Sequence, residues 1–127
     1  MTKRLYPRPV YLNLLQIRLP VAGIMSIIHR VTGVFMVLAI PLLMYLMQLS
    51  LKSPEGFSAT AAWLAYPLVK FVLFLALWGL MHHFLAGIRY LLIDVEIGVD
   101  APYYKNSAWV VMLASPLLAL LLLGGLS

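Results

Sequence analysis

Three long apolar runs, separated by short polar segments, set the pattern of this chain. The runs free of charged residues cover 31–51, 71–88 and 107–127. A helix needs about 20 mostly apolar residues to cross the hydrocarbon core of a bilayer. The pattern therefore predicts an all-α membrane protein in which one domain, 1–127, contains three transmembrane helices. The predicted helices cover about 21–50, 62–94 and 103–126.

Polar and mixed segments lie between and before these runs. The stretch RPVYLNLLQIRLP, 8–20, is mildly amphipathic and ends at Pro20. We expect it to form a short interfacial segment that leads into the first helix. The stretch SLKSPEGFSAT, 50–60, is expected to be a loop. The first apolar run is too long for a signal peptide and is not followed by a small-residue cleavage site, so we expect it to be retained.

Composition supports the membrane assignment and limits the chemistry. Hydrophobic residues make up 64% of the 127 positions and charged residues only 10%, whereas soluble proteins carry about 25% charged residues. Three spans cannot close a β-barrel, so helices are favoured. The chain has no cysteine, which excludes disulfides, cysteine-ligated iron–sulfur clusters and covalently attached haem c. A redox centre in this chain would need histidine or methionine ligands.

The basic residues predict the orientation in the membrane. Four of them precede the first span, namely Lys3, Arg4, Arg8 and Arg18. Arg89 and Lys105 flank the loop between the second and third spans. Because cytoplasmic loops are enriched in lysine and arginine, we expect a cytoplasmic N-terminus and a periplasmic C-terminus. The net charge of +5 is thereby explained, and no nucleic-acid partner is expected.

A polar stripe lies on the first predicted helix, in the stretch SIIHRVTG. Ser26, His29, Arg30 and Gly33 are spaced i, i+3, i+4 and i+7, so they share one helix face. Polar residues on one face of a membrane helix point into a bundle or a cavity and often mark a functional site. The alternative is that Arg30 extends back to the headgroups while its neighbours serve packing alone.

A second polar stripe lies on the second predicted helix. It consists of Gly79, His83, Gly87, Tyr90 and Asp94. His82 lies about 100° away, on a face with Trp78, Ala86 and Arg89. A planar macrocycle on a helix histidine passes close to the backbone, and glycines leave room for it. The pattern favours His83 over His82 as an iron ligand. A histidine that only hydrogen-bonds a neighbouring helix remains the alternative.

The two stripes are predicted to meet. His29 lies nine residues after Pro20, and His83 lies eleven residues before Asp94. At 1.5 Å per residue both histidines fall about 13 to 17 Å from the cytoplasmic boundary. A haem between the stripes would place its iron on His83 and its propionates toward His29 and Arg30, and the planar fork of arginine suits carboxylates.

These same residues carry a resemblance to a known family. The segments RPVYLNLLQIRLPVAGIMSIIHRVTGV and HHFLAGIRYLLID resemble the two signatures of the cytochrome b membrane anchors of succinate dehydrogenase, respiratory complex II. The order and spacing of both motifs are kept, and SLKSPEGF resembles the outer loop of some members. One position departs from the family pattern, because Tyr90 stands where the family often has histidine.

The resemblance implies a function and a role for each residue. It implies haem b with His83 as the axial ligand of the iron, and His29, Arg30 and Tyr90 near the propionates. It implies ubiquinone as substrate, with Ser26 and Arg30 lining the quinone site. Separately from the resemblance, the place of Asp94 near the cytoplasmic end of the His83 stripe suggests a proton route to the quinone; the alternative is an ordinary solvated aspartate at a helix end.

The resemblance also implies partners and a place in the cell. It implies a second anchor subunit that supplies the other axial histidine, an iron–sulfur subunit, a flavoprotein subunit and the bacterial inner membrane. The chain would not be catalytic alone, but would pass electrons from succinate oxidation to quinone as a succinate dehydrogenase subunit. The alternative from another class is a haem-free structural anchor of a different enzyme or transporter.

Overall fold

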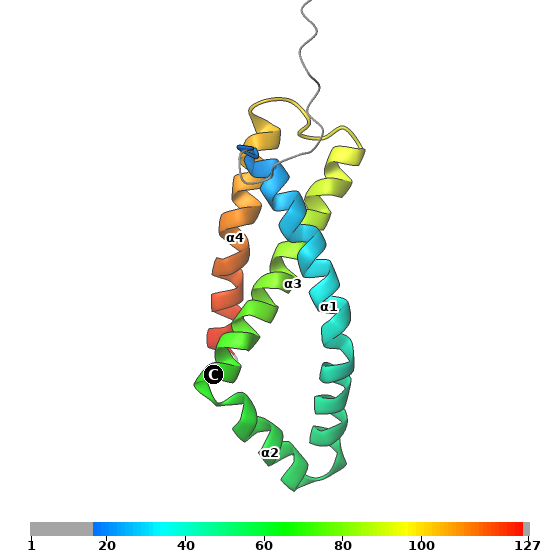
Figure 1. The fold of residues 1–127 in the computed structure, drawn as a ribbon, viewed down its shortest axis with the longest axis vertical. Helices are drawn as coiled ribbons and strands as arrows, with labels where there is room; N and C mark the ends of the chain where they lie inside the picture. Colours follow the sequence, from blue (N-terminus) through cyan, green and yellow to red (C-terminus); the bar gives the residue numbers. More distant parts are fainter. Residues whose placement is uncertain (1–16, 126–127) are drawn as a thin grey trace, which may run out of the picture.

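The computed structural model describes 17–125 of the chain. It contains four α-helices in the order α1 (Val21–Lys52), α2 (Pro54–Leu64), α3 (Pro67–Asp94) and α4 (Tyr103–Gly125) (Figure 1). Three of them, α1, α3 and α4, are long and apolar enough to cross a membrane. This confirms the prediction of an all-α protein with three candidate spans. Most of the predicted interfacial segment, 8–16, lies outside the described residues.

The first helix is longer than a bilayer requires. α1 has 32 residues, which corresponds to about 48 Å at 1.5 Å per residue, whereas the hydrocarbon core is about 30 Å thick. It begins directly after Pro20, whose carbonyl accepts the first helical hydrogen bonds, from Gly23 and Ile24. Pro41 lies inside the helix without ending it, as membrane helices tolerate.

The segment expected to be a loop forms a helix of its own. α2 follows α1 after one extended residue, Ser53, whose hydroxyl accepts a hydrogen bond from the backbone N–H of Gly56 at 3.1 Å. Pro54 occupies the first helical position, where a missing N–H costs nothing. The span predicted from residue 62 begins instead at Pro67, because the chain is extended at Tyr66. The serine cap and both prolines are helix-start signals in the sequence.

The corner between α1 and α2 is closed by a glycine. A side chain at Gly56 would overlap the backbone carbonyl oxygen of Leu49, so the two helices touch through their backbones. In Figure 1, α1 and α3 lie together in the upper half and diverge below, where α2 joins their lower ends. α1, α3 and α4 pack together at the end of the bundle opposite α2 (Figure 1).

The residues of α4 that pack against the other helices are mostly small. The fully or nearly buried residues of α4 are Ala108, Val111, Ser115 and Ala119, which lie on one face. Those of α3 are His82, Ala86 and Arg89. Small side chains let membrane helices approach closely, which is how such helices gain van der Waals contact. The outer faces carry large exposed side chains, with Leu38 67% and Leu121 72% exposed. This suits an apolar surrounding rather than water.

Candidate functional site

The centre of the α1–α3 seam is a pair of stacked histidines. The imidazole rings of His29 and His83 lie 4.0 Å apart between centroids and only 10° from parallel. The two residues lie 54 positions apart in the sequence. The prediction that the two polar stripes meet is therefore confirmed.

One ring nitrogen of His83 is held by the backbone of α1. Its Nδ1 lies 2.9 Å from the carbonyl oxygen of His29. Because a carbonyl can only accept, Nδ1 carries the proton and donates it. Within 17–125, Nε2 has no hydrogen-bond partner, so it keeps a free lone pair. A histidine that binds a metal typically donates its other ring N–H to a carbonyl or carboxylate in this way.

Gly33 makes this approach of His83 to the backbone possible. A Cβ atom at Gly33 would lie 2.8 Å from Cε1 of His83 and 3.3 Å from Nδ1. Such distances are shorter than ordinary carbon contacts, which are about 3.5 Å or more. Thr32 lies beside Gly33, with its hydroxyl donating to the carbonyls of Ile28 and His29 at 2.9 and 3.0 Å. The sequence reading missed the packing role of both residues.

The two glycines that flank His83 have α1 side chains as neighbours. A Cβ at Gly79 would lie 3.5 Å from the methyl carbon of Thr32, and one at Gly87 would lie 3.9 Å from Nε2 of His29. The sequence predicted that the space beside these glycines admits a macrocycle. In the structure the two glycines serve the close packing of α1 against α3, and the tightest approach to His83 comes from Gly33.

His82 is enclosed where α1, α3 and α4 meet. Its side chain has no exposed surface. Nε2 lies 3.4 Å from the carbonyl oxygen of Met25, and Nδ1 lies 3.4 Å from the hydroxyl oxygen of Ser115. A neutral imidazole satisfies both contacts by donating from Nε2 and accepting at Nδ1. Both ring nitrogens are therefore used inside the chain, and His82 offers none to an iron.

The half-buried Tyr90 packs against the histidine pair. Its ring meets that of His29 edge to face, with 5.2 Å between centroids. Its hydroxyl oxygen is enclosed by the protein and has no hydrogen-bond partner within 17–125. The guanidinium carbon of Arg89 lies 5.8 Å from the centre of the tyrosine ring. Tyr90 therefore positions His29 through its ring, whereas its hydroxyl points into packed protein.

Arg89 joins α3 to α4. It is 7% exposed and donates from Nε to the hydroxyl of Ser107 at 2.9 Å and from its terminal nitrogen to the carbonyl of Tyr104 at 2.7 Å. The two bonds use the planar fork of the guanidinium, which a lysine cannot reproduce. Sequence reasoning placed Arg89 on the face of His82 but did not assign it this role.

Ser26 and Arg30 form a second group on the outer side of α1. The terminal nitrogen of Arg30 donates to the hydroxyl oxygen of Ser26 at 3.0 Å, and Arg30 is exposed. Arg30 also borders an apolar hollow of about 510 Å³ that includes Gly33, Val34, Val37 and Leu38. These two residues are thus together, as predicted, but Arg30 is exposed and Ser26 is half-buried, while His29 packs on α3. Asp94, the last residue of α3, is exposed.

The donor set suits a haem better than a bare metal ion. Within the described part of the chain, no three histidine, cysteine or carboxylate side chains are grouped to bind a metal. In the seam, the ring of His83 is fixed by its Nδ1 hydrogen bond, and its Nε2 is left available. A haem iron needs only one histidine nitrogen from a given protein chain, because the macrocycle supplies four of its ligands. His29 stacks on His83 in the seam and Arg30 is exposed on α1, and both side chains suit a carboxylate by their chemistry.

Comparison with known proteins identifies the family. The model of the succinate dehydrogenase/fumarate reductase transmembrane subunit family matches 4–122. The succinate dehydrogenase cytochrome b556 subunit of Paracoccus denitrificans is 33% identical over 117 residues, which cover 91% of this chain and 89% of that protein. The subunit of the same name from Coxiella burnetii is 32% identical over 109 residues, covering 85% and 87%. The chain therefore belongs to the family of succinate dehydrogenase/fumarate reductase transmembrane subunits.

Proposed function

We propose that this chain is the haem b-binding membrane anchor of a succinate:quinone oxidoreductase and that it forms part of the ubiquinone-reduction site. The observation that carries the proposal is the hydrogen bond between Nδ1 of His83 and the carbonyl of His29. It fixes the tautomer and the plane of the ring, and it leaves Nε2 to coordinate iron. The names of the two relatives, both cytochrome b556 subunits, point to the same cofactor.

The residues around His83 have distinct tasks in this proposal. His83 would bind the haem iron through Nε2, and Gly33 lets its ring reach the α1 backbone. His29 and Arg30 would hold the haem propionates, with Arg30 supplying two parallel donors to a carboxylate. Tyr90 takes part by packing its ring on His29, since its hydroxyl is enclosed by the chain itself. When bound, haem b would supply a one-electron redox centre.

Ser26 and Arg30 are proposed to bind the quinone. The Ser26 oxygen accepts a hydrogen bond from Arg30, so its own proton remains available for a quinone carbonyl. Arg30 would stabilise the negative charge that develops on the quinone oxygen as it is reduced. The apolar hollow beside Arg30 would accept the apolar part of the substrate. Asp94 is proposed to deliver protons from the aqueous side, on the basis of its exposed position at the end of α3.

The partners follow from the same proposal. A second anchor subunit would supply the other axial histidine, an iron–sulfur subunit would deliver electrons, and a flavoprotein subunit would oxidise succinate. We propose the bacterial inner membrane as the location, with the N-terminus in the cytoplasm and the C-terminus in the periplasm. The support for this orientation is the group of four lysine and arginine residues before α1, namely Lys3, Arg4, Arg8 and Arg18.

Two activities of the complete complex test the quinone role. Ser26→Ala and Arg30→Leu should lower succinate–quinone reductase activity at least tenfold, while succinate oxidation by a soluble dye stays unchanged. Ser50→Ala is the matched control, because Ser50 donates to its own helix at the other end of α1. If both activities of the Ser26 and Arg30 variants fell equally, the defect would lie in assembly. If neither fell, the two residues would not belong to the quinone site.

A further inference from the structure

A second hollow lies at the opposite end of α1 from the histidines. It has a volume of about 730 Å³ and is lined by Pro41, Met44, Tyr45, Met47, Gln48, Leu51 and Lys52. All seven residues belong to α1, in the half of the helix that diverges from α3 (Figure 1). We call this hollow the outer groove. It is distinct from the proposed haem and quinone sites and independent of them.

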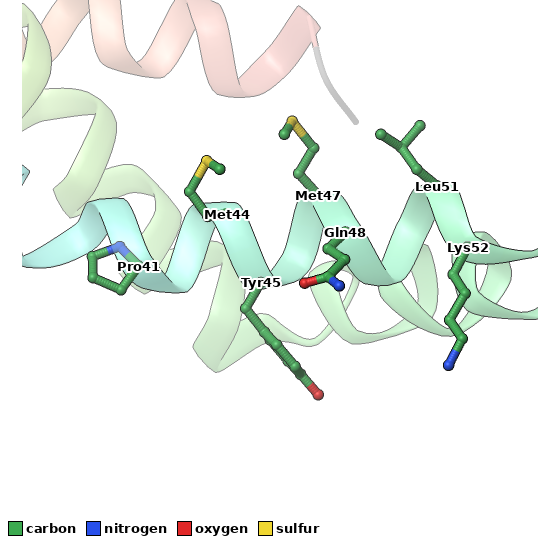
Figure 2. A pocket seen from close by; sticks show the side chains of 7 residues that line it. All are labelled: Pro41, Met44, Tyr45, Met47, Gln48, Leu51 and Lys52. Carbon is green, nitrogen blue, oxygen red and sulfur yellow. The ribbon is translucent and has the colours of Figure 1, made fainter.

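The outer groove has a polar side and an apolar side. Figure 2 shows Met44, Met47 and Leu51 projecting to one side of the helix, while Tyr45 and Lys52 project to the other. The polar side is a stripe, because positions 45, 48 and 52 are spaced i, i+3 and i+7. Tyr45 is 62% exposed and Leu51 is 78% exposed, so the groove is open within this chain.

The polar groups follow one another in order of depth. Lys52 is the last residue of α1 and follows the charge-free run 31–51, whose length matches the roughly 20 residues that cross the hydrocarbon core. With this run as the crossing segment, Lys52 lies at the level of the outer headgroups, and the inner edge of the core falls near residue 31 rather than at Pro20, the boundary used in the sequence prediction. Gln48 lies about 6 Å deeper, Tyr45 about 10 Å deeper, and Pro41 about 16 Å deeper, at 1.5 Å per residue. A cation, an amide, a phenol and then an apolar surface thus succeed each other from the interface inward.

The hydrogen-bonding groups of this stripe are available. Within 17–125, the side chains of Tyr45 and Gln48 make no hydrogen bond. Glu55 is the acidic residue closest to Lys52 in the sequence. Within 17–125, Lys52 forms no ion pair with Glu55 or with another carboxylate, so its ammonium is available to an external anion.

We propose that the outer groove binds an anionic glycerophospholipid. The phosphate would pair with Lys52, the ester carbonyls just below it would accept from Gln48 and Tyr45, and an acyl chain would lie along Met44 and Pro41. The order of groups in such a lipid, anion, then esters, then hydrocarbon, matches the order of groups along α1. Basic residues at the membrane surface attract anionic lipids, and tyrosine is enriched at this level.

Lipid binding is tested on the purified complex with phosphatidylglycerol as the probe. The complex is delipidated in detergent and titrated with phosphatidylglycerol or phosphatidylcholine, and bound lipids are counted by native mass spectrometry. We expect the wild-type complex to prefer phosphatidylglycerol. Lys52→Gln should lose about fivefold of that preference, because one basic residue near the membrane surface contributes about 1 kcal/mol to the binding of anionic lipid. Lys70→Gln is the matched control, because Lys70 lies near the same end of the bundle on α3. Equal losses in both variants would overturn the proposal, because they would show a general effect of charge.

A photo-crosslinking residue at position 48 identifies what covers the groove. We expect an adduct with lipid in membranes of the intact complex. An adduct with another protein chain would overturn the proposal and make the groove a contact between subunits. Gln48→Leu and Tyr45→Phe should each lower phosphatidylglycerol binding, and wild-type binding in both variants would contradict the assignment of the ester contacts.

Discussion

Gly33 is the position at which the smallest change should disturb the proposed haem ligand. In Gly33→Ala the new Cβ would lie 2.8 Å from Cε1 of His83. Carbon atoms in contact prefer about 3.5 to 4.0 Å, so the ring must move by about 0.7 Å or more. The ring is not free to do so, since His29 covers one face at 4.0 Å and holds Nδ1 at 2.9 Å.

The free-energy cost of Gly33→Ala is expected to be modest. Overpacking of this kind costs about 1 to 3 kcal/mol, while alanine in place of glycine in a helix contributes about 1 kcal/mol in the opposite direction. The net loss of stability is then at most about 2 kcal/mol, and the chain still folds. The effect should instead concentrate on His83, as a lower haem content or a shifted α-band and midpoint potential of the purified complex.

Two other glycines provide the controls for this prediction. Gly23→Ala adds a methyl group 3.6 Å from a carbon of Pro20, and Gly79→Ala adds one 3.5 Å from Thr32, both of which are ordinary contacts. Both variants should keep the wild-type spectrum and haem content. The reasoning is refuted if Gly33→Ala behaves as wild type while Gly79→Ala loses haem. That result would mean that the glycines of α3, rather than Gly33, make room for the macrocycle.

Three further predictions concern packing. Ser115→Ala should lower the free energy of unfolding by about 0.6 kcal/mol, the average for side-chain hydrogen bonds between membrane helices, and a loss above about 2 kcal/mol in denaturant titrations would contradict this. Gly56→Ala should destabilise by about 1 to 3 kcal/mol because it meets the Leu49 carbonyl, with Ser58→Ala as a neutral control. Arg89→Lys should weaken the packing of α3 against α4, because lysine cannot make both hydrogen bonds of the guanidinium. The loop between α3 and α4 should then be cleaved faster by protease, and an unchanged cleavage rate would show that these two hydrogen bonds do not hold the helices together.

The sequence predicted the spans well because bilayer thickness imposes a length on apolar helices. It did not predict α2, although the signals were present. Ser53 and Pro54 are a cap and a first-turn residue, yet a short polar stretch between two spans resembles a loop when only hydropathy is considered. The start of α3 was predicted too early for the same reason, since the apolar residues before Pro67 belong to α2 and the connection.

Helical periodicity also predicted which residues share a face. His82, Ala86 and Arg89 were placed on one face, and they are the buried residues of α3. The partner of that face was not predictable, because Ser115 and Ser107 lie on a helix whose rotation is set by packing. Likewise, periodicity put Ser26 and Arg30 on the face of His29. His29 and Arg30 are consecutive and therefore lie about 100° apart around α1. Arg30 is exposed, whereas the ring of His29 packs on α3.

The glycines show where a pattern has more than one explanation. Gly79 and Gly87 suggested space for a macrocycle, but a glycine leaves equal space for a side chain of a neighbouring helix. The structure fills that space with Thr32 and His29. A sequence cannot decide between a cofactor and a neighbouring helix, because both require only the absence of Cβ. The contact of Gly33 with His83 depends on the register between α1 and α3, which the sequence does not specify.

The central claim is that His83, and not His82, binds the haem iron. A reduced-minus-oxidised visible spectrum of the intact, partner-bound complex tests it most directly. The geometry predicts a b-type α-band that is lost in His83→Ala and survives in His82→Ala, because His82 uses both ring nitrogens inside the bundle. An α-band that survives in His83→Ala, or no haem band in the wild-type complex, would contradict the claim and favour a haem-free structural anchor.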